Sequence, residues 1–176
     1  MNCTVILNAE AQRNAEIARA DNRSCRDTFC AKPLCEFLRS LKLRGLMRIW
    51  VTIAVIAHLL VAIFHGQAHT SLGVGLSNWQ NLYVLAVIVL APLVALILSF
   101  TRFAKAGLWL LLASMLGSLI FGACYHYVII SPDHVAHLPV GEARGLFRTT
   151  ALLLLITETF GVGVAGISLR RSLKRA

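Results

Sequence analysis

Charged side chains are scarce in this chain of 176 residues, and one long stretch has none. Only 14% of the residues are Asp, Glu, Lys or Arg, whereas a soluble domain usually carries about a quarter. No charged residue occurs from Ile49 to Thr101. Because a soluble protein could not leave so long a stretch uncharged and stay dispersed, the composition excludes an ordinary soluble domain.

The net charge of +9 is concentrated at the flanks of the apolar segments, which argues against a nucleic-acid partner. Nine of the 17 Lys and Arg residues lie at or before Arg48, and four more lie between Arg170 and Arg175. Basic residues in these places set membrane topology rather than bind bases. We therefore expect the lipid bilayer as a partner and no nucleic acid. A membrane-protein partner and a homo-oligomer both stay open.

The cysteines lack the Cys-x2-Cys spacing that is typical of a structural zinc site. Cys25, Cys30 and Cys35 are instead separated by four residues each. We expect free thiols in a reducing compartment. Cys124 is expected to be a small apolar filler inside a membrane span.

Four apolar segments are long enough to cross a membrane as helices, which takes about 20 residues. We predict spans over residues 47–66, 82–100, 107–130 and 147–169. Short connections make consecutive helices antiparallel neighbours. The predicted fold is all-α: a polytopic integral membrane protein with a four-helix transmembrane bundle, residues 47–176, and a poorly structured N-terminal extension, residues 1–46.

The N-terminal extension allows two interpretations. It is either a cytoplasmic segment, partly helical near Glu36 to Arg44, or a spurious addition to a protein that starts at Met47. A further alternative concerns Gly66-Gln67-Ala68, where small residues follow an apolar run. Such residues suit cleavage of the first span as a signal peptide.

The basic residues predict that both termini are cytoplasmic. They cluster before span one, between spans two and three, and after span four, which all lie on one side of a four-span protein. On the other side, the first loop has no charge and the second carries only two basic residues, Arg144 and Arg148. The positive-inside rule then predicts a multi-pass protein of the bacterial inner (plasma) membrane, with these two loops facing outward.

Small residues and one proline indicate how the spans pack. Small side chains at four-residue intervals let membrane helices approach closely, and they occur on spans three and four: Ser114, Ser118, Gly122, Gly161 and Ala165. Pro92 is expected to kink span two, because it removes a backbone donor.

All six histidines lie between His58 and His137, which is the main indication of chemistry. On an ideal helix His58, His65 and His69 project within a sector of about 40°. They form one stripe if Gly66 does not end the helix. His65 and His69 are four residues apart, so both can bind one metal ion from one helix face.

A second pair with chelate spacing, His134 and His137, follows span three. The preceding Ser131-Pro132-Asp133 is typical of a helix start, which would put both rings on one face. Neutral imidazoles suit copper, zinc or iron. We predict an outward-facing transition-metal cluster with six candidate ligands: His65, His69, His126, His134, His137 and Asp133.

Glu158 places a carboxylate in the middle of span four, which is costly unless the group is paired or neutral. His58 lies at a similar depth, so we predict an intramembrane polar pair of His58 and Glu158. The pair would relay protons, support the metal site or fix the register of the bundle, and these roles stay open.

Two other functions stay open beside metal binding. A b-type haem electron-transfer protein would use His65 and His126, at similar depth, as axial ligands. A non-catalytic membrane assembly or transport component would carry histidines only because membrane interfaces tolerate them. The catalytic residues are unknown, so whether the protein is an enzyme stays undecided.

Overall fold

The computed structural model describes residues 32–174, with side chains described from Gly45 onward. The chain divides into two compact units, Met1–Gly45 and Leu46–Ala176, and all the contacts given below lie in the second. The predicted character of residues 1–46 falls mostly outside the described residues. Only its last part is seen, as backbone of the helix that begins at Lys32.

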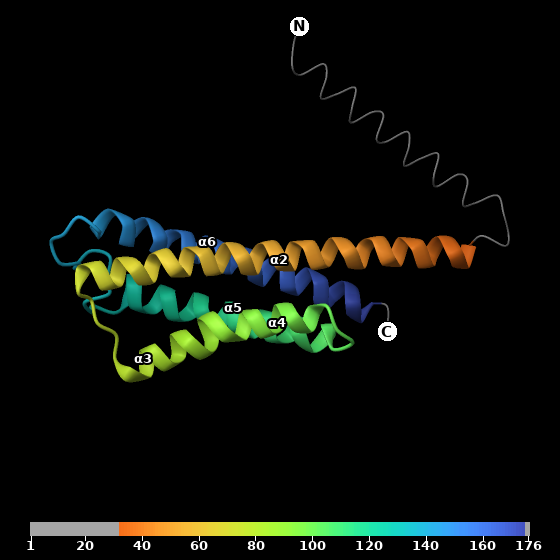
Figure 1. Ribbon diagram of the computed structural model, residues 1–176, viewed down its shortest axis with the longest axis horizontal. Coiled ribbons are helices and arrows are strands. Elements are labelled where there is room, and N and C mark those ends of the chain that lie inside the picture. Colours follow the sequence, from red (N-terminus) through yellow and green to blue (C-terminus); the bar gives the residue numbers. More distant parts are fainter. Residues whose placement is uncertain (1–31, 175–176) are drawn as a thin grey trace, which may run out of the picture. The chain divides into compact units, whose positions relative to one another are not determined.

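The described part of the chain is all-helical and contains no strand. Four helical stretches are long and apolar enough to cross a membrane: Gly45–Leu72, Asn78–Ser99, Ala104–Val128 and Arg144–Leu173. The prediction of an all-α fold with four membrane-spanning helices is confirmed to that extent. Figure 1 shows these helices running alongside one another, with their connections at the two ends.

Two of the spans are single α-helices, and the other two combine α-helical and π-helical elements. The first and last spans lie in α2 (Lys32–Leu72) and α6 (Arg144–Leu173). The second span consists of three elements: α3 (Asn78–Tyr83), the π-helical η1 (Val84–Leu90) and α4 (Ala91–Ser99). The third consists of α5 (Ala104–Ala123) and the π-helical η2 (Cys124–Val128).

Helix α2 continues through Gly66 and ends at Leu72, beyond the predicted end of the first span. A helical glycine costs about 1 kcal/mol relative to alanine, but the buried Ala68 and His69 beyond it pack into the bundle and offset this cost. Gly73 then ends the helix with φ of 65°, a conformation that glycine adopts without strain. The Val74 N–H donates to the His69 carbonyl, which completes a Schellman cap.

Pro92 lies where the second span changes from π-helical to α-helical turns. The π-helical segment η1 directly precedes it, and the proline occupies the first turn of α4. Proline has no N–H to donate to the carbonyl four residues earlier, which is that of Ile88. The Ile88 carbonyl therefore lacks the donor that position 92 would otherwise supply in an α-helix.

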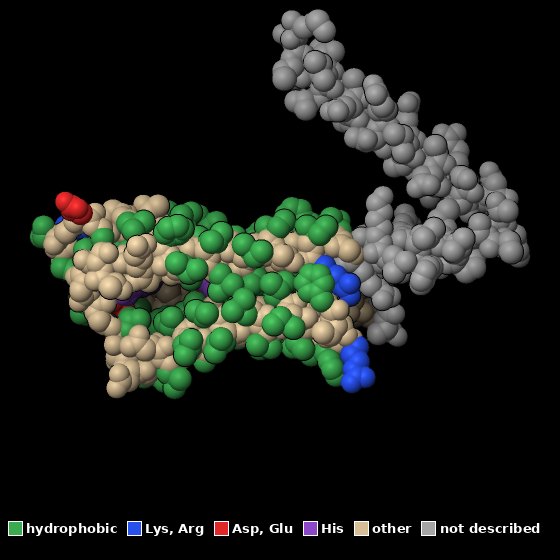
Figure 2. Space-filling model, in the orientation of Figure 1, with side chains coloured by type: hydrophobic (Ala, Val, Ile, Leu, Met, Phe, Trp, Pro, Cys, Tyr) green, Lys and Arg blue, Asp and Glu red, His purple; other side chains and the backbone are tan. Residues whose placement is uncertain are grey.

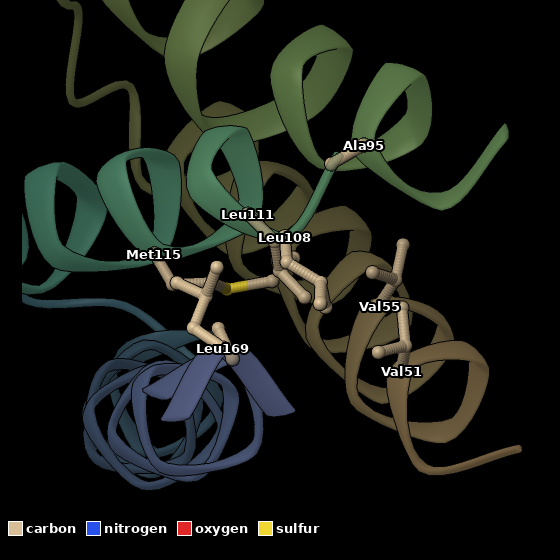
Figure 3. Packing of buried hydrophobic residues seen from close by; sticks show 8 residues of the cluster. Val51, Val55, Ala95, Leu108, Leu111, Met115 and Leu169 are labelled. Carbon is tan, nitrogen blue, oxygen red and sulfur yellow. The ribbon is translucent and has the colours of Figure 1, made fainter. Parts of the chain in front are cut away.

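Helix α5 packs against both α4 and α6. Side chains from all four spans meet in one apolar cluster: Val51, Val55, Ala95, Leu108, Leu111, Met115, Ala165 and Leu169. Figure 3 shows the α5 side chains of this cluster lying among those of the other helices. All five small residues predicted at helix contacts are buried: Ser114, Ser118, Gly122, Gly161 and Ala165.

The outer faces of the four helices suit contact with lipid tails. Large apolar side chains are more than half exposed on each span, as in Ile63, Ile97, Ile120 and Ile156. Figure 2 shows such side chains covering the visible face of the bundle. A water-soluble monomer rarely exposes an apolar surface of this extent, so the described unit has the surface expected of a membrane protein.

The loop of residues 129–143 does not contain the short helix predicted after Ser131. It forms consecutive turns, with the His134 N–H donating to the Ser131 carbonyl and the His137 N–H donating to the His134 carbonyl. The Val135 N–H donates to the carbonyl of His126, which ties the loop to the end of η2. The helix prediction was wrong because this tertiary hydrogen bond competes with a helical one.

The close approach of α4 and α5 at Gly107 predicts a specific stability defect. A Cβ at Gly107 would lie 2.8 Å from the Ala95 carbonyl oxygen and 3.1 Å from the Ser99 nitrogen, both backbone atoms. Gly107→Ala should therefore destabilise the protein by about 1–3 kcal/mol, as overpacking does. The measurement is thermal unfolding of the helical circular dichroism signal in a fixed detergent.

The matched control is Gly163→Ala, since a Cβ there would meet nothing within 4 Å. It should leave the unfolding midpoint unchanged or raise it, because alanine favours a helix by up to about 1 kcal/mol. Equal midpoints for the two variants would contradict the packing described for α4 and α5.

Candidate metal centre

Three buried histidines from two helices bring their ring nitrogens together and could hold a metal ion. His65 and His69 come from α2, and His126 comes from η2. The Nε2 atom of His65 lies 3.1 Å from that of His126 and 3.2 Å from that of His69. The exposed fractions of these three residues are only 5–9%. The name "histidine triad" is used for these three residues below.

The stripe predicted on α2 accounts for two members of the triad. Because α2 continues through Gly66, His58, His65 and His69 all face the bundle interior and are buried. The third member depends on η2, where the Ile129 N–H donates to the Cys124 carbonyl five residues earlier. A π-helical turn changes the direction in which later side chains project, and His126 lies inside it.

Hydrogen bonds at the other ring nitrogen define the tautomer of two triad members. The Nδ1 of His69 lies 3.3 Å from the Val74 carbonyl oxygen, and the Nδ1 of His126 lies 3.1 Å from the Asp133 carbonyl oxygen. A carbonyl oxygen only accepts hydrogen bonds, so each Nδ1 carries the proton. In a neutral ring the Nε2 atom is then left with a free lone pair.

The hydroxyl of Thr150 on α6 defines the tautomer of His65. The hydroxyl donates its one proton within α6, to the Leu146 carbonyl at 2.7 Å and the Phe147 carbonyl at 3.1 Å. Its oxygen lies 2.9 Å from His65 Nδ1 and therefore accepts from it. The three Nε2 atoms are thus left free of these outer bonds, and one ligand atom from each ring lies within 4.8 Å of the others, as a metal-binding group requires.

Phe147 provides an apolar wall for the triad. It is fully buried, and its ring centroid lies 4.6 Å from that of His65, 4.8 Å from that of His69 and 5.4 Å from that of His126. Leu138 from the second loop packs in the same apolar cluster. This wall excludes water from one side of the triad and strengthens the electrostatic interactions there.

Asp133 lies beside the triad and contacts it at the outer nitrogens. Its carboxylate Oδ1 is 3.7 Å from His69 Nδ1, on the side of the ring away from the shared space. Burial raises the pKa of the Asp133 carboxyl, and the neighbouring His69 opposes this shift when it is charged. At this distance the carboxylate makes no direct hydrogen bond to His69, and its Oδ1 has no hydrogen-bond partner among the described residues.

The structure brings together only part of the predicted ligand set. Among the described residues, the group that could hold a metal ion comprises the triad and includes neither His134 nor His137. Their rings lie 5.0 Å apart, centroid to centroid, in the second loop. His137 is exposed, and His134 Nδ1 accepts a hydrogen bond from the Ala136 N–H. The spacing of this pair reflects a local turn rather than a shared site with the triad.

His58 and Glu158 lie next to each other deeper in the bundle. His58 Nδ1 is 3.9 Å from Glu158 Oε1, and the two residues are 0% and 1% exposed. The distance is too long for a direct hydrogen bond. The two groups predicted as a polar pair are therefore adjacent, without a direct bond between them.

A cavity of about 500 Å³ extends from the triad to Glu158, and His58 is not among its lining residues. Its lining includes the triad, Asp133, Ser118 and Glu158, with apolar walls from α2, η1, α5 and α6. The mouth lies among exposed small and polar residues of the first loop and its flanks: Gly66, Thr70, Gly73, Gly75 and Asn81. Figure 2 shows a hollow at this end of the molecule, with histidine side chains visible inside.

The triad leaves no space for a b-type haem between His65 and His126, the alternative that the sequence left open. Two axial ligands must lie on opposite faces of a flat macrocycle, with the iron between them. The two Nε2 atoms are only 3.1 Å apart, and the ring of His69 approaches the same space. The geometry favours a single ion over a haem.

Comparison of the chain with protein-family models, with curated proteins and with solved structures finds no match. The assignment of a function therefore depends on the geometry of the triad and its cavity.

The hydrogen bond from His65 to Thr150 gives a test of how the triad is oriented. Thr150→Val removes the acceptor for His65 Nδ1 and should weaken zinc binding by on the order of 10–100-fold, as the loss of such outer partners does. Isothermal titration of the purified protein with Zn²⁺ measures the change.

Thr157→Val is the matched control on the same helix, because within the described part of the chain the Thr157 hydroxyl bonds only to the Leu153 and Leu154 carbonyls. Its affinity for zinc should equal that of the unmodified protein. If Thr150→Val also binds zinc normally, Thr150 does not orient His65.

Proposed function

We propose that this is a multi-pass membrane protein that binds one transition-metal ion at His65, His69 and His126. The observation that supports this is the meeting of three Nε2 lone pairs, each set by a hydrogen bond at the opposite nitrogen. Lone pairs at 3.1–3.2 Å repel one another unless a cation lies between them. Burial inside the bundle also separates this triad from histidines that merely lie at a membrane interface.

Zinc is the first candidate among copper, zinc and iron. A tetrahedral ion with metal–nitrogen bonds of 2.0–2.1 Å holds its nitrogens about 3.3 Å apart, close to the two distances from His65 Nε2 to its neighbours in the triad. Copper(I) prefers thiolate or thioether ligands, and non-haem iron commonly takes a carboxylate as third ligand. The triad offers three nitrogens, and the carboxylate of Asp133 lies beside His69 Nδ1 and is not part of the group that could hold the ion.

The position of the triad supports access from outside the cell. It lies at the end of the bundle that carries the loops of residues 73–77 and 129–143. Most basic residues flank the spans at the other end, among them Arg48, Arg102, Lys105 and Arg171. By the positive-inside rule that end is cytoplasmic, so the cavity mouth opens to the periplasm if the membrane is the bacterial inner membrane.

Three protein ligands leave the fourth position of a tetrahedral ion open, as in catalytic zinc sites. The adjoining cavity makes this position available to water or to another ligand. The chemistry proposed at this level is therefore reversible binding of the ion from the outer face, with an exchangeable fourth ligand.

Removing one triad histidine tests the proposal directly. His126→Ala removes a ligand and should weaken zinc binding by more than about 100-fold. This exceeds the loss expected when only a hydrogen-bond partner of a ligand is removed, as in Thr150→Val. The measurement is the zinc content of purified protein by elemental analysis after equilibration with Zn²⁺ and removal of free ion. Parallel samples with Cu⁺ and Fe²⁺ identify the preferred metal.

The control is the double variant His134→Ala and His137→Ala, which removes the other chelate pair and leaves the triad intact. It should retain its zinc. Loss of zinc in this variant, together with normal binding by His126→Ala, would move the site to the second loop and refute the proposal.

A further inference from the structure

His58 and Glu158 form a second group of potential ligands that the triad does not use. Both residues are buried, and neither His58 Nδ1 nor Glu158 Oε2 has a hydrogen-bond partner among the residues that the structure describes. Buried polar atoms normally have partners. In an apolar bundle two unsatisfied groups this close indicate that something else interacts with both.

The tautomer of His58 is set by the proline in span two. His58 Nε2 lies 3.0 Å from the Ile88 carbonyl oxygen, so this nitrogen carries the proton and donates. That carbonyl is available because Pro92, four residues later, has no N–H to give to it. The His58 Nδ1 atom is therefore left with a free lone pair on the side of Glu158.

The distance between the two groups suits a shared ion better than a shared proton. At 3.9 Å, His58 Nδ1 and Glu158 Oε1 are beyond hydrogen-bond range. Metal bonds to histidine nitrogen and carboxylate oxygen are 2.0–2.2 Å long, so a tetrahedral ion holds two such atoms about 3.4 Å apart. An ion at this pair would therefore draw the two groups together by about 0.5 Å or bind them at a wider angle. A carboxylate also supplies the negative charge that makes a buried cation tolerable.

The cavity extends from the triad to Glu158, the member of the pair that lines it, and His58 lies behind Glu158 at 3.9 Å. A Cβ on Gly122 would lie 3.8 Å from Glu158 Oε2 and 3.9 Å from His126 Cδ2, so both groups border the same small space. Ser118 also lines the cavity, and its hydroxyl oxygen lacks a hydrogen-bond partner within the described part of the chain. The apolar cluster around Leu111 and Met115 packs the interior further along the bundle.

We propose that His58 and Glu158 form a second binding site for a divalent transition-metal cation, with Ser118 and cavity water as further oxygen ligands. The triad is the outer site and this pair is the inner site, and an ion that enters at the cavity mouth occupies one after the other. The inner site stands on its own residues, whereas its place in this sequence of sites rests on the proposed function of the triad.

The test is the number of zinc ions bound per chain by the full-length protein in lipid nanodiscs, measured by elemental analysis after removal of free ion. The unmodified protein should bind two. Glu158→Gln keeps the size of the side chain and removes its charge, so it should bind one. His126→Ala should also bind one, and the two changes combined should abolish binding.

A pair of serine variants on α5 provides a milder comparison. Ser118→Ala removes a proposed oxygen ligand. It should weaken the affinity for the second zinc ion by about tenfold, the smallest loss usual when a group around a metal site is removed. Ser114→Ala is the control, because the Ser114 hydroxyl bonds to the Leu111 carbonyl of its own helix. It should bind both ions normally, and circular dichroism checks that each variant is folded.

The outcomes separate the two proposals. One zinc ion per chain that is retained in Glu158→Gln and lost in His126→Ala would overturn the inner site and leave the triad standing. One ion that is lost in Glu158→Gln and retained in His126→Ala would support the inner site and refute the function proposed for the triad.

Discussion

One electrostatic constraint governs this end of the structure. The triad histidines keep free lone pairs on their Nε2 atoms inside an apolar helix bundle, so each ring needs a hydrogen-bond acceptor at Nδ1. Each triad histidine donates from Nδ1 to an oxygen of a different element: Thr150 on α6, Val74 after α2 and Asp133 after η2. Several features of the fold serve these bonds, including the left-handed Gly73 and the turns that follow η2. The loops at this end are therefore part of the site and not only connections.

Much of the fold and part of the site could be predicted from the sequence, because they depend on local periodicity. Apolar runs predict four spans, and a period of 3.6 residues predicts that His58, His65 and His69 share a face. Both predictions concern single helices. Their success reflects how strongly hydropathy and helix geometry constrain a membrane protein.

The rest of the site depends on how separate elements meet, which local spacing does not reveal. His134 and His137 have a chelate spacing as regular as that of His65 and His69, yet they occupy turns apart from the triad. Thr150 lies 85 residues from His65, and no motif connects them. Pro92 was a sequence feature that pointed to one of these contacts. It has no N–H to donate to the Ile88 carbonyl, and that carbonyl accepts a hydrogen bond from His58.

Helix α2 runs without a break through His58, His65 and His69. Seven helical residues span about 10 Å, almost two full turns, so His58 and His65 keep a fixed separation and orientation relative to each other. A rotation of this helix about its own axis would turn all three rings away from the bundle interior together. One continuous helix therefore carries histidines of both candidate sites. A rotation of this helix would disrupt the two sites together and could not disrupt one alone.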